Sequence, residues 1–263
     1  MVVISAAKSD IGRQRNTNED AFYVDSSMGL YIICDGVGGH VAGEVASNMA
    51  IEFATDYLCE ARVRRVLPQK ADPDFRVVWS RLVVESIESC CDQLYAYASS
   101  HTHLDGMATT ITIALIVEDV AFVGHVGDCR LYLKRGEIIT QLTRDHTLLE
   151  DLSSANQNRL DQITSTEQLK NFRHVLTRCA GRERDFEVEA FHLDLSPSDR
   201  LLLCSDGLSN YFADDPQICE LLSGETVQVT VESMIEFANI KGGHDNITAI
   251  VIECCDRVPS RVN

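Results

Sequence analysis

Two long helical segments that follow one another without a strand between them most limit the folds open to this chain. In the first, apolar residues recur every four positions, which predicts a helix with one buried face; they are Val41, Val45, Met49, Phe53 and Tyr57. The second is expected to begin at Asp72-Pro73, where a capping residue precedes proline in the first turn. Its apolar face comprises Val78, Leu82, Ile87, Cys91 and Leu94. Because strand-like runs lie on both sides in sequence, we expect a helical hairpin that covers a β-sheet.

Short apolar runs typical of β-strands precede and follow this helical pair. They comprise residues 21–24, 30–34, 109–117, 120–126, 130–133, 138–142, 186–195, 201–204 and 247–254. Glu118-Asp119 and Arg135-Gly136 stand where short hairpin turns are expected, which indicates antiparallel pairing in the middle of the chain. Residues 227–238 fit either a strand or a helix, and the sequence Lys241-Gly242-Gly243 that follows favours the helix.

The net charge, the length of the apolar stretches and the placement of the cysteines exclude some classes of function and location for this chain. Asp and Glu total 40 against 23 Lys and Arg, a net charge of −17, which argues against nucleic acid as the main partner. The longest apolar stretches, such as residues 113–117, are far shorter than the ~20 residues of a membrane-spanning helix. The ten cysteines include no CxxC pair, and Cys34 and Cys204 end apolar runs as small buried residues do. We therefore expect a reduced, cytoplasmic protein without membrane insertion.

Neither an internal repeat nor a Pro/Gly/Ser-rich linker divides the 263 residues. We therefore expect one domain over residues 1–256, followed by a C-terminal tail at 257–263. Residues 145–184 are polar, rich in Ser, Thr, Asn and Gln, and poor in periodic apolar positions. This composition predicts an irregular insertion, which we call the flap, rather than a second domain.

Four aspartates stand at the ends of apolar runs: Asp35, Asp128, Asp206 and Asp245. Two of them precede glycine, which lets the backbone carbonyl turn toward a ligand. Carboxylates gathered at one edge of a sheet repel each other unless a cation lies between them, and Mg²⁺ or Mn²⁺ prefers such oxygen ligands. Any single Asp-Gly pair could instead be an ordinary turn. The sequence alone does not bring the four together in space.

Six segments, in this order along the chain, carry a resemblance to a known family. They are residues 12–20 (GRQRNTNED), 35–40 (DGVGGH), 106–110 (GMATT), 127–130 (GDCR), 203–208 (LCSDGL) and 242–248 (GGHDNIT). The chain resembles the metal-dependent Ser/Thr protein phosphatases of the protein phosphatase 2C type, in their compact bacterial form. The matching segments span nearly the whole chain, and their order makes the set specific although each one is weak alone.

The resemblance implies an α+β fold, a four-layer α-β-β-α sandwich of two antiparallel sheets flanked by helices, with a metal cleft at one edge. It implies that Asp35 bridges two Mn²⁺ or Mg²⁺ ions and that the Gly36 carbonyl binds one of them. Asp206 and Asp245 would complete the coordination of the other ion. Asp128, together with Asp206, would bind a possible third ion. The flap would lie beside the cleft.

The resemblance also implies roles for residues near the N-terminus. Arg15 matches the arginine that binds the phosphate, and a planar guanidinium can hold two phosphate oxygens at once. Glu19 and Asp20 would hold the waters of the metal ions by hydrogen bonds. Many eukaryotic relatives carry a histidine, a proposed general acid, where this chain has Val37, as many bacterial members do. His40 is a candidate for that role, although a structural role or proton transfer from water fits equally.

The implied activity is Mn²⁺- or Mg²⁺-dependent hydrolysis of phosphoserine and phosphothreonine in proteins by a metal-activated water. The implied partners are phosphorylated proteins, including a bacterial Ser/Thr kinase and its substrates. Two other functions stay open at this point. A non-catalytic phosphoprotein-binding module on the same fold is expected to lose metal ligands, and this chain keeps the main ones. Hydrolysis of a small phosphate ester is also compatible with the metal site. His244, beside Asp245, is expected to be exposed.

Overall fold

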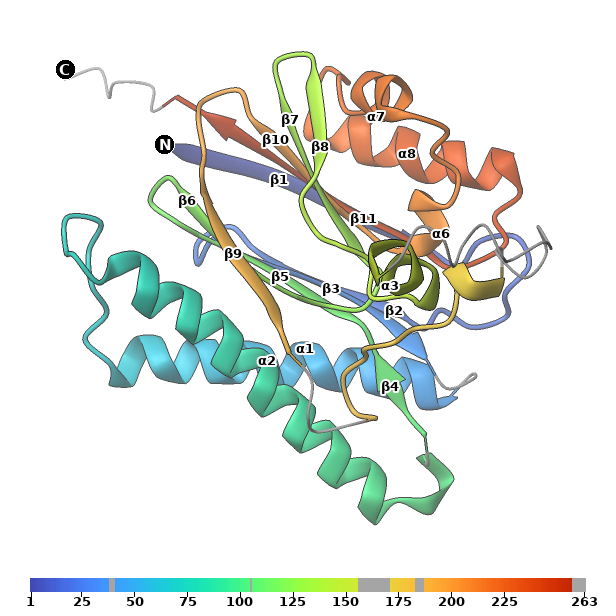
Figure 1. Ribbon diagram of the computed structural model, residues 1–263. Helices are drawn as coiled ribbons and strands as arrows, with labels where there is room; N and C mark the ends of the chain where they lie inside the picture. The colour runs from blue at the N-terminus through green and yellow to red at the C-terminus, as the bar shows by residue number, and fades with distance from the viewer. Residues whose placement is uncertain (38–40, 105, 156–170, 183–186, 257–263) are drawn as a thin grey trace.

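The computed structural model describes residues 1–37, 41–104, 106–155, 171–182 and 187–256, and two antiparallel β-sheets lie at its centre (Figure 1). The five-stranded sheet has the order β1-β11-β10-β7-β8, and the six-stranded sheet has the order β2-β3-β5-β6-β9 with β4 paired to β3. The strands of the first sheet are β1 (Val2–Asp10), β11 (Ile247–Cys255), β10 (Arg200–Cys204), β7 (Arg130–Arg135) and β8 (Ile138–Gln141). Those of the second are β2 (Asp20–Asp25), β3 (Leu30–Val37), β4 (Ala108–Thr109), β5 (Ile111–Val117), β6 (Val120–Val126) and β9 (Glu189–Asp194).

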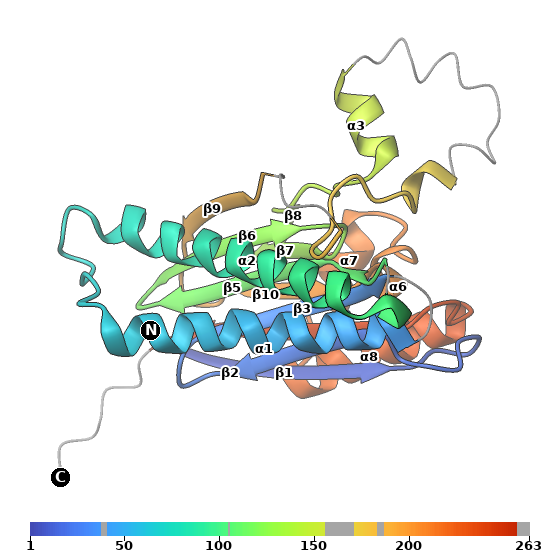
Figure 2. The same ribbon diagram turned by 90° about the horizontal axis from the view of Figure 1, so that it is seen from below.

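Helices cover the outer face of each sheet. The antiparallel pair α1 (Val41–Arg64) and α2 (Phe75–Ser100) packs on the six-stranded sheet, and the 3-10 turn η1 (Thr102–Leu104) follows α2. On the five-stranded sheet lie α6 (Asp206–Ser209), α7 (Asp215–Leu221) and α8 (Val227–Lys241). Figure 1 shows the two sheets between these helix layers, and Figure 2 shows α1 and α2 side by side. The predicted four-layer α-β-β-α sandwich is confirmed.

Both faces of each central strand are buried, because one face meets the other sheet and the other meets helices. In β3, Tyr31 and Ile33 point into the cluster between the sheets, whereas Leu30, Ile32 and Cys34 point into the cluster under α1 and α2. A strand buried on both faces reads as a continuous apolar run rather than an alternating one. This explains why β3 and β10 were recognisable as unbroken apolar runs in the sequence.

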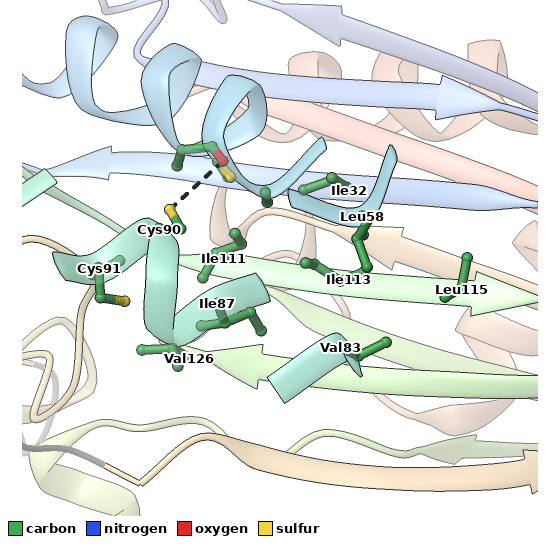
Figure 3. Packing of buried hydrophobic residues seen from close by; sticks show 14 of the residues in the cluster. Ile32, Leu58, Val83, Ile87, Cys90, Cys91, Ile111, Ile113, Leu115 and Val126 are labelled. Atoms are coloured by element: carbon green, nitrogen blue, oxygen red, sulfur yellow. Dashed lines mark hydrogen bonds between the residues drawn. The ribbon is translucent and has the colours of Figure 1, made fainter. Parts of the chain in front are cut away.

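The predicted apolar stripe of α1 is wrong by one position along the helix. The residues that are buried against the sheet and α2 are Ala42, Ala46, Ala50, Ala54, Leu58 and Ala61, whereas Val45, Met49, Phe53 and Tyr57 lie partly buried at the margin. The small alanine side chains let α1 approach its neighbours closely, and the thiol of Cys90 on α2 donates to the carbonyl of Ala50 at 3.6 Å (Figure 3). The larger residues fill the space beside this contact.

Other element boundaries differ from the sequence expectation in places. The helix α2 begins at Phe75 rather than at Asp72, because the Asp72 carboxylate accepts a hydrogen bond from the Gln69 amide in the preceding loop. The edge strand β1 was not predicted, since its residues are only partly buried and alternate weakly. The choice of a helix for residues 227–238 is confirmed by α8.

The flap contains regular structure that its composition did not predict. Helix α3 (Leu148–Ala155) lies within residues 145–184, so the expectation of an irregular segment is wrong there. Residues 156–170 and 183–184 of the flap, and the tail at 257–263, lie outside the described residues. Among the helices that the structure describes, none is long and apolar enough to cross a membrane.

Candidate functional site

A cavity of about 650 Å³ opens where several strands end. It is lined by seven of the residues singled out in the sequence: Arg15, Glu19, Asp35, Gly36, Asp128, Asp206 and Asp245. Asp20 is buried beside it. His40, the candidate general acid, lies outside the described residues, and Val37 lines the cavity. The predicted set therefore meets at one place, although its members come from opposite ends of the chain.

Asp20 and Asp35 lie directly opposite each other in the pairing of β2 with β3. The hydroxyls of Ser205 and Thr248 each donate to Asp20 Oδ2 at 2.7 Å. Burial, and beyond it repulsion from neighbouring aspartates, raises the pKa of Asp20 to about 7 against the lowering effect of those two hydrogen bonds. Burial and then the charge of Asp20 raise the pKa of Asp35 well above its ordinary value. Two acids so placed cannot both carry a negative charge at neutral pH without a compensating cation.

The backbone around Asp35 is fixed by its neighbours. The expected single strand 109–117 is interrupted at Thr110, whose amide donates to the Asp35 carbonyl at 2.9 Å and whose hydroxyl accepts from the Asp35 amide at 2.8 Å. On the other side, a Cβ atom added to Gly43 would lie 1.9 Å from Glu19 Oε2. Glycine at position 43 therefore lets the first turn of α1 approach the carboxylate of Glu19, a residue that is only 7% exposed.

Asp206 and Asp245 come together where α6 begins and β11 approaches. A Cβ atom on Gly207 would lie 1.9 Å from the Asn246 carbonyl oxygen, so glycine allows these two segments to touch. Asn246 donates its amide hydrogen to Asp245 Oδ1 at 2.8 Å, and its side-chain oxygen accepts from the Glu19 amide at 2.8 Å. Asn246 thus joins the two acidic segments, a role that the sequence motif did not reveal.

Arg15 forms an ion pair with Asp245, Nη2 to Oδ2 at 2.7 Å. Burial and the charge of Asp206 raise the pKa of Asp245, while the Asn246 amide and Arg15 act in the opposite direction. His174 Nδ1 of the flap, which also lines the cavity, lies 3.7 Å from Asp206 Oδ2. The hydrogen bond to Asp206 raises the pKa of His174.

Asp128 follows Gly127 at the turn between β6 and β7. Gly127 has a positive φ of 116°, and a Cβ atom there would lie 2.5 Å from Thr110, so the turn depends on glycine. Burial and then repulsion from Asp206 raise the pKa of Asp128 well above its ordinary value. Asp128 and Asp206 also line a second, smaller cavity of about 200 Å³ together with Ser209.

The donor set fits divalent cations bound through oxygen. The Oδ1 atoms of Asp20 and Asp206 are buried and have no hydrogen-bond partner within the described parts of the chain. Buried carboxylate oxygens of this kind are costly unless a proton or a cation satisfies them. Mg²⁺ and Mn²⁺ accept carboxylate and carbonyl oxygens and keep several waters, and the cavity has room for these.

A cluster of His125, His146 and Glu189 lies behind the turn that carries Asp128, and sequence reasoning missed it. Their ligand-capable atoms lie within 4.8 Å of one another. The Gly127 amide donates to His146 Nδ1 at 3.1 Å, so the proton of the neutral ring is on Nε2, which faces Glu189 Oε2 at 3.4 Å. Both nitrogens of His125 are also occupied, by the Thr112 hydroxyl and the Arg144 carbonyl. The cluster therefore fastens the start of the flap to the Asp128 turn by hydrogen bonds.

Tyr211 fixes the turn that precedes Asp245. Its hydroxyl lies 2.6 Å from His244 Nδ1 and accepts from the His244 amide at 3.0 Å. His244 is exposed, as the sequence predicted. Tyr211 and His244 lie 33 residues apart, so a single sequence carries no signal for this contact.

Comparison with known proteins identifies the family. A family model described as protein phosphatase 2C matches residues 11–252. The serine/threonine phosphatase stp of Listeria monocytogenes is 32% identical over 250 residues, which cover 94% of each chain. The crystal structure of the Mycobacterium tuberculosis serine/threonine phosphatase PstP/Ppp matches with a TM-score of 0.80 and 29% identity, and covers 97% of this chain and 100% of that one.

A second solved structure bears on the metal. The catalytic domain of serine threonine protein phosphatase PstP in complex with two manganese ions matches with a TM-score of 0.79 and 31% identity, and covers 97% of this chain and 99% of that one. The family match extends over both ends of the cavity-lining set, from Arg15 to Asp245. The chain therefore belongs to the protein phosphatase 2C family.

Proposed function

We propose that this chain, a serine/threonine protein phosphatase, hydrolyses phosphoserine and phosphothreonine in proteins with the help of Mn²⁺ or Mg²⁺ bound in the 650 Å³ cavity. One observation carries the proposal. Buried and half-buried carboxylates from distant segments meet in this cavity, and burial and mutual repulsion raise the pKa values of Asp35 and Asp128 well above their ordinary range. The family relationship supports the same conclusion, since a similar structure contains two manganese ions.

We assign the binding of two cations to Asp35, the Gly36 carbonyl, Asp206 and Asp245. A third cation would bind between Asp128 and Asp206, and the second cavity that both line supports this placement. When bound, two such cations lower the pKa of a water toward neutrality and offset the charge that develops on the phosphoryl group. Both effects favour attack on phosphorus at neutral pH.

The chain's own residues would bind and orient the substrate. Arg15 lines the cavity and offers the forked donor that matches two phosphate oxygens. Glu19 and Asp20 would accept hydrogen bonds from waters, and the hydroxyls on Asp20 Oδ2 keep that carboxylate in one orientation. Val37 has no proton to give to the departing alkoxide. His40 therefore stays a candidate for that proton transfer, beside water.

The proposed reaction suggests a partner for the enzyme, and its cysteines suggest a location. A protein phosphatase acts on what a protein kinase has phosphorylated, so we propose that the enzyme opposes a bacterial Ser/Thr kinase. The ten cysteines all lie within the described residues and are free thiols, which supports the proposal of a cytoplasmic protein.

A phosphothreonine peptide tests the proposal. We expect Mn²⁺-dependent phosphate release that excess chelator abolishes. The Asp206→Asn variant should release no phosphate, although its circular dichroism spectrum shows that it is folded. The control is the exposed Asp56→Asn on α1, which keeps the activity. Release from a small phosphate ester but from no phosphopeptide would contradict the assignment to protein substrates.

A further inference from the structure

Arg182 is a cation on the wall of the catalytic cavity to which the proposed mechanism gives no role. Its side chain is exposed and lines the cavity with Asp35 and Asp206. Within the part of the chain that the structure describes, its guanidinium forms no hydrogen bond and no ion pair. Arg15, by contrast, is already paired with Asp245 at 2.7 Å. With respect to the described residues, the Arg182 guanidinium is therefore available to bind an anion.

The backbone beneath Arg182 is held in place. Ala180 and Thr109 exchange two hydrogen bonds, at 3.0 and 2.8 Å, which join this part of the flap to β4. Gly181 is buried with a positive φ of 97°, and a Cβ atom there would lie 3.3 Å from Leu94 Cβ on α2. Because this backbone packs against β4 and α2, the Cα atom of Arg182 has a defined position at the wall of the cavity.

The chemistry of the ligand follows from the guanidinium and from its position. An arginine fork binds carboxylates and phosphates through two parallel hydrogen bonds. The phosphate to be hydrolysed is assigned to Arg15 and the cations, so Arg182 is available for a second anionic group on the same substrate. Three residues of extended peptide span at most about 10–11 Å. Because Arg182 and the carboxylates assigned to the cations line one cavity of about 650 Å³, we place the second anion within about three residues of the phosphorylated side chain.

We propose that Arg182 is a specificity-determining residue that binds a carboxylate or a second phosphate close in sequence to the phosphoserine or phosphothreonine. This inference rests on the proposed function, because it concerns the same cavity and the same substrates. It predicts that the enzyme, in spite of its net charge of −17, prefers acidic phosphopeptides to neutral ones.

Matched phosphothreonine peptides test the proposal, each with one varied position placed one to three residues before or after the phosphothreonine. The varied residue is Glu, Gln, Lys or phosphoserine. With the Mn²⁺-loaded full chain, kcat/KM is measured for loss of the phosphate on threonine alone, which fragment-ion mass spectrometry distinguishes from loss at serine. We expect Glu or phosphoserine to be preferred over Gln by about five-fold, as an exposed ion pair allows. Preference for the Glu peptide assigns a carboxylate, and preference for phosphoserine alone assigns a second phosphate.

Substitutions show whether Arg182 causes the preference. Arg182→Ala should remove it, Arg182→Lys should keep part of it, and Arg182→Glu should reverse it toward the Lys peptide. The matched control is Arg64→Ala at the end of α1, where the side chain is 73% exposed and paired with Glu60; it should leave the preference unchanged. The readout is the ratio of kcat/KM values for two peptides measured with the same enzyme preparation. A partial loss of folded enzyme lowers both values equally and therefore does not change the ratio.

The outcomes separate this inference from the proposed function. If the wild-type enzyme hydrolyses all the peptides at equal rates, or if Arg182→Ala keeps the full preference, the role of Arg182 is overturned and the phosphatase assignment stands. If no phosphopeptide is hydrolysed with any divalent cation, the proposed function fails and the inference fails with it.

Discussion

At the scale of a single residue, Asp20 shows what it costs to bury an acid beside the cavity. Its carboxylate is buried, is held by Ser205 and Thr248, and keeps one oxygen without a partner among the described residues. Burial raises its pKa from the ordinary 3.8 to about 7. A folded chain without metal must therefore take up a proton at Asp20 or hold a buried negative charge.

The metal-free protein should accordingly become less stable as the pH rises. Between about pH 4 and 7, Asp20 is protonated when folded and ionised when unfolded, so folding takes up a proton. The contribution is fully retained below the unfolded pKa and is lost as the pH rises through the folded one. Thermal unfolding in chelator should show a melting temperature that falls over this range, and saturating Mn²⁺ should flatten the curve.

The control for this pH dependence is Asp20→Asn, which removes one titrating group but leaves an oxygen to accept from both hydroxyls. It should reduce the slope of stability against pH in chelator. An equal slope in the variant would show that Asp20 is ionised in the folded protein, contrary to its raised pKa.

Substitution of Arg15 tests its role in binding phosphate. Arg15→Ala should raise KM for a phosphopeptide about ten-fold or more, since a hydrogen bond to a charged group is worth about 1.5–3 kcal/mol. Arg15→Lys should restore only part of the affinity, because an ammonium group cannot hold two oxygens in a fork. Steady-state kinetics at saturating Mn²⁺ measure both. Full recovery with lysine would mean that charge alone matters at this position.

The residues of the site were predictable to different degrees. Asp35, Asp206 and Asp245 stood out because each adjoins an apolar run. The order of the motifs along the chain then indicated, through the family resemblance, that these residues belong to one site. Asn246 and Tyr211 were missed because their partners lie far away in sequence, at Glu19 and His244. Contacts of that range leave no periodic pattern in one sequence.

At the scale of elements, α1 shows where periodicity misleads. The sequence favoured its larger apolar residues as the buried face, yet the contact with the sheet and α2 uses the alanines beside them. A pattern of hydrophobicity weights large side chains, whereas close approach of a helix to two neighbours requires small ones. Strand β1 was missed for a related reason, since an edge strand that is only partly buried alternates weakly.

Enlarging the alanine face of α1 tests this packing. Ala50→Leu should lower the free energy of unfolding by about 1–3 kcal/mol, the usual cost of overpacking a filled core. Ala50 is fully buried, and its carbonyl accepts the Cys90 thiol (Figure 3). Val45→Leu at the margin of the same helix is the matched control and should cost much less. Urea unfolding of both variants measures the difference, and equal losses would contradict the assigned face.

At the scale of the whole molecule, pairing of the two ends of the chain builds the site. Strand β1 pairs with β11 along its full length, from Val2 with Cys255 to Asp10 with Ile247. This register brings the loop that carries Arg15 next to Asp245, 230 residues away in sequence. Composition and periodicity predicted strands but not this pairing, which depends on how the sheets assemble. Only the resemblance to a known family indicated that these segments meet.

The carboxylates gathered by this pairing should bind the cations on which hydrolysis depends. Calorimetric titration of Mn²⁺ into the metal-free chain, with phosphate release from a phosphothreonine peptide followed in parallel, tests this dependence. We predict at least two bound Mn²⁺ ions per chain, with activity appearing as they bind. Asp35→Asn should lose both binding and activity while remaining folded. Undiminished phosphate release in excess chelator, or Mn²⁺ binding that Asp35→Asn leaves unchanged, would contradict metal-dependent hydrolysis at this site.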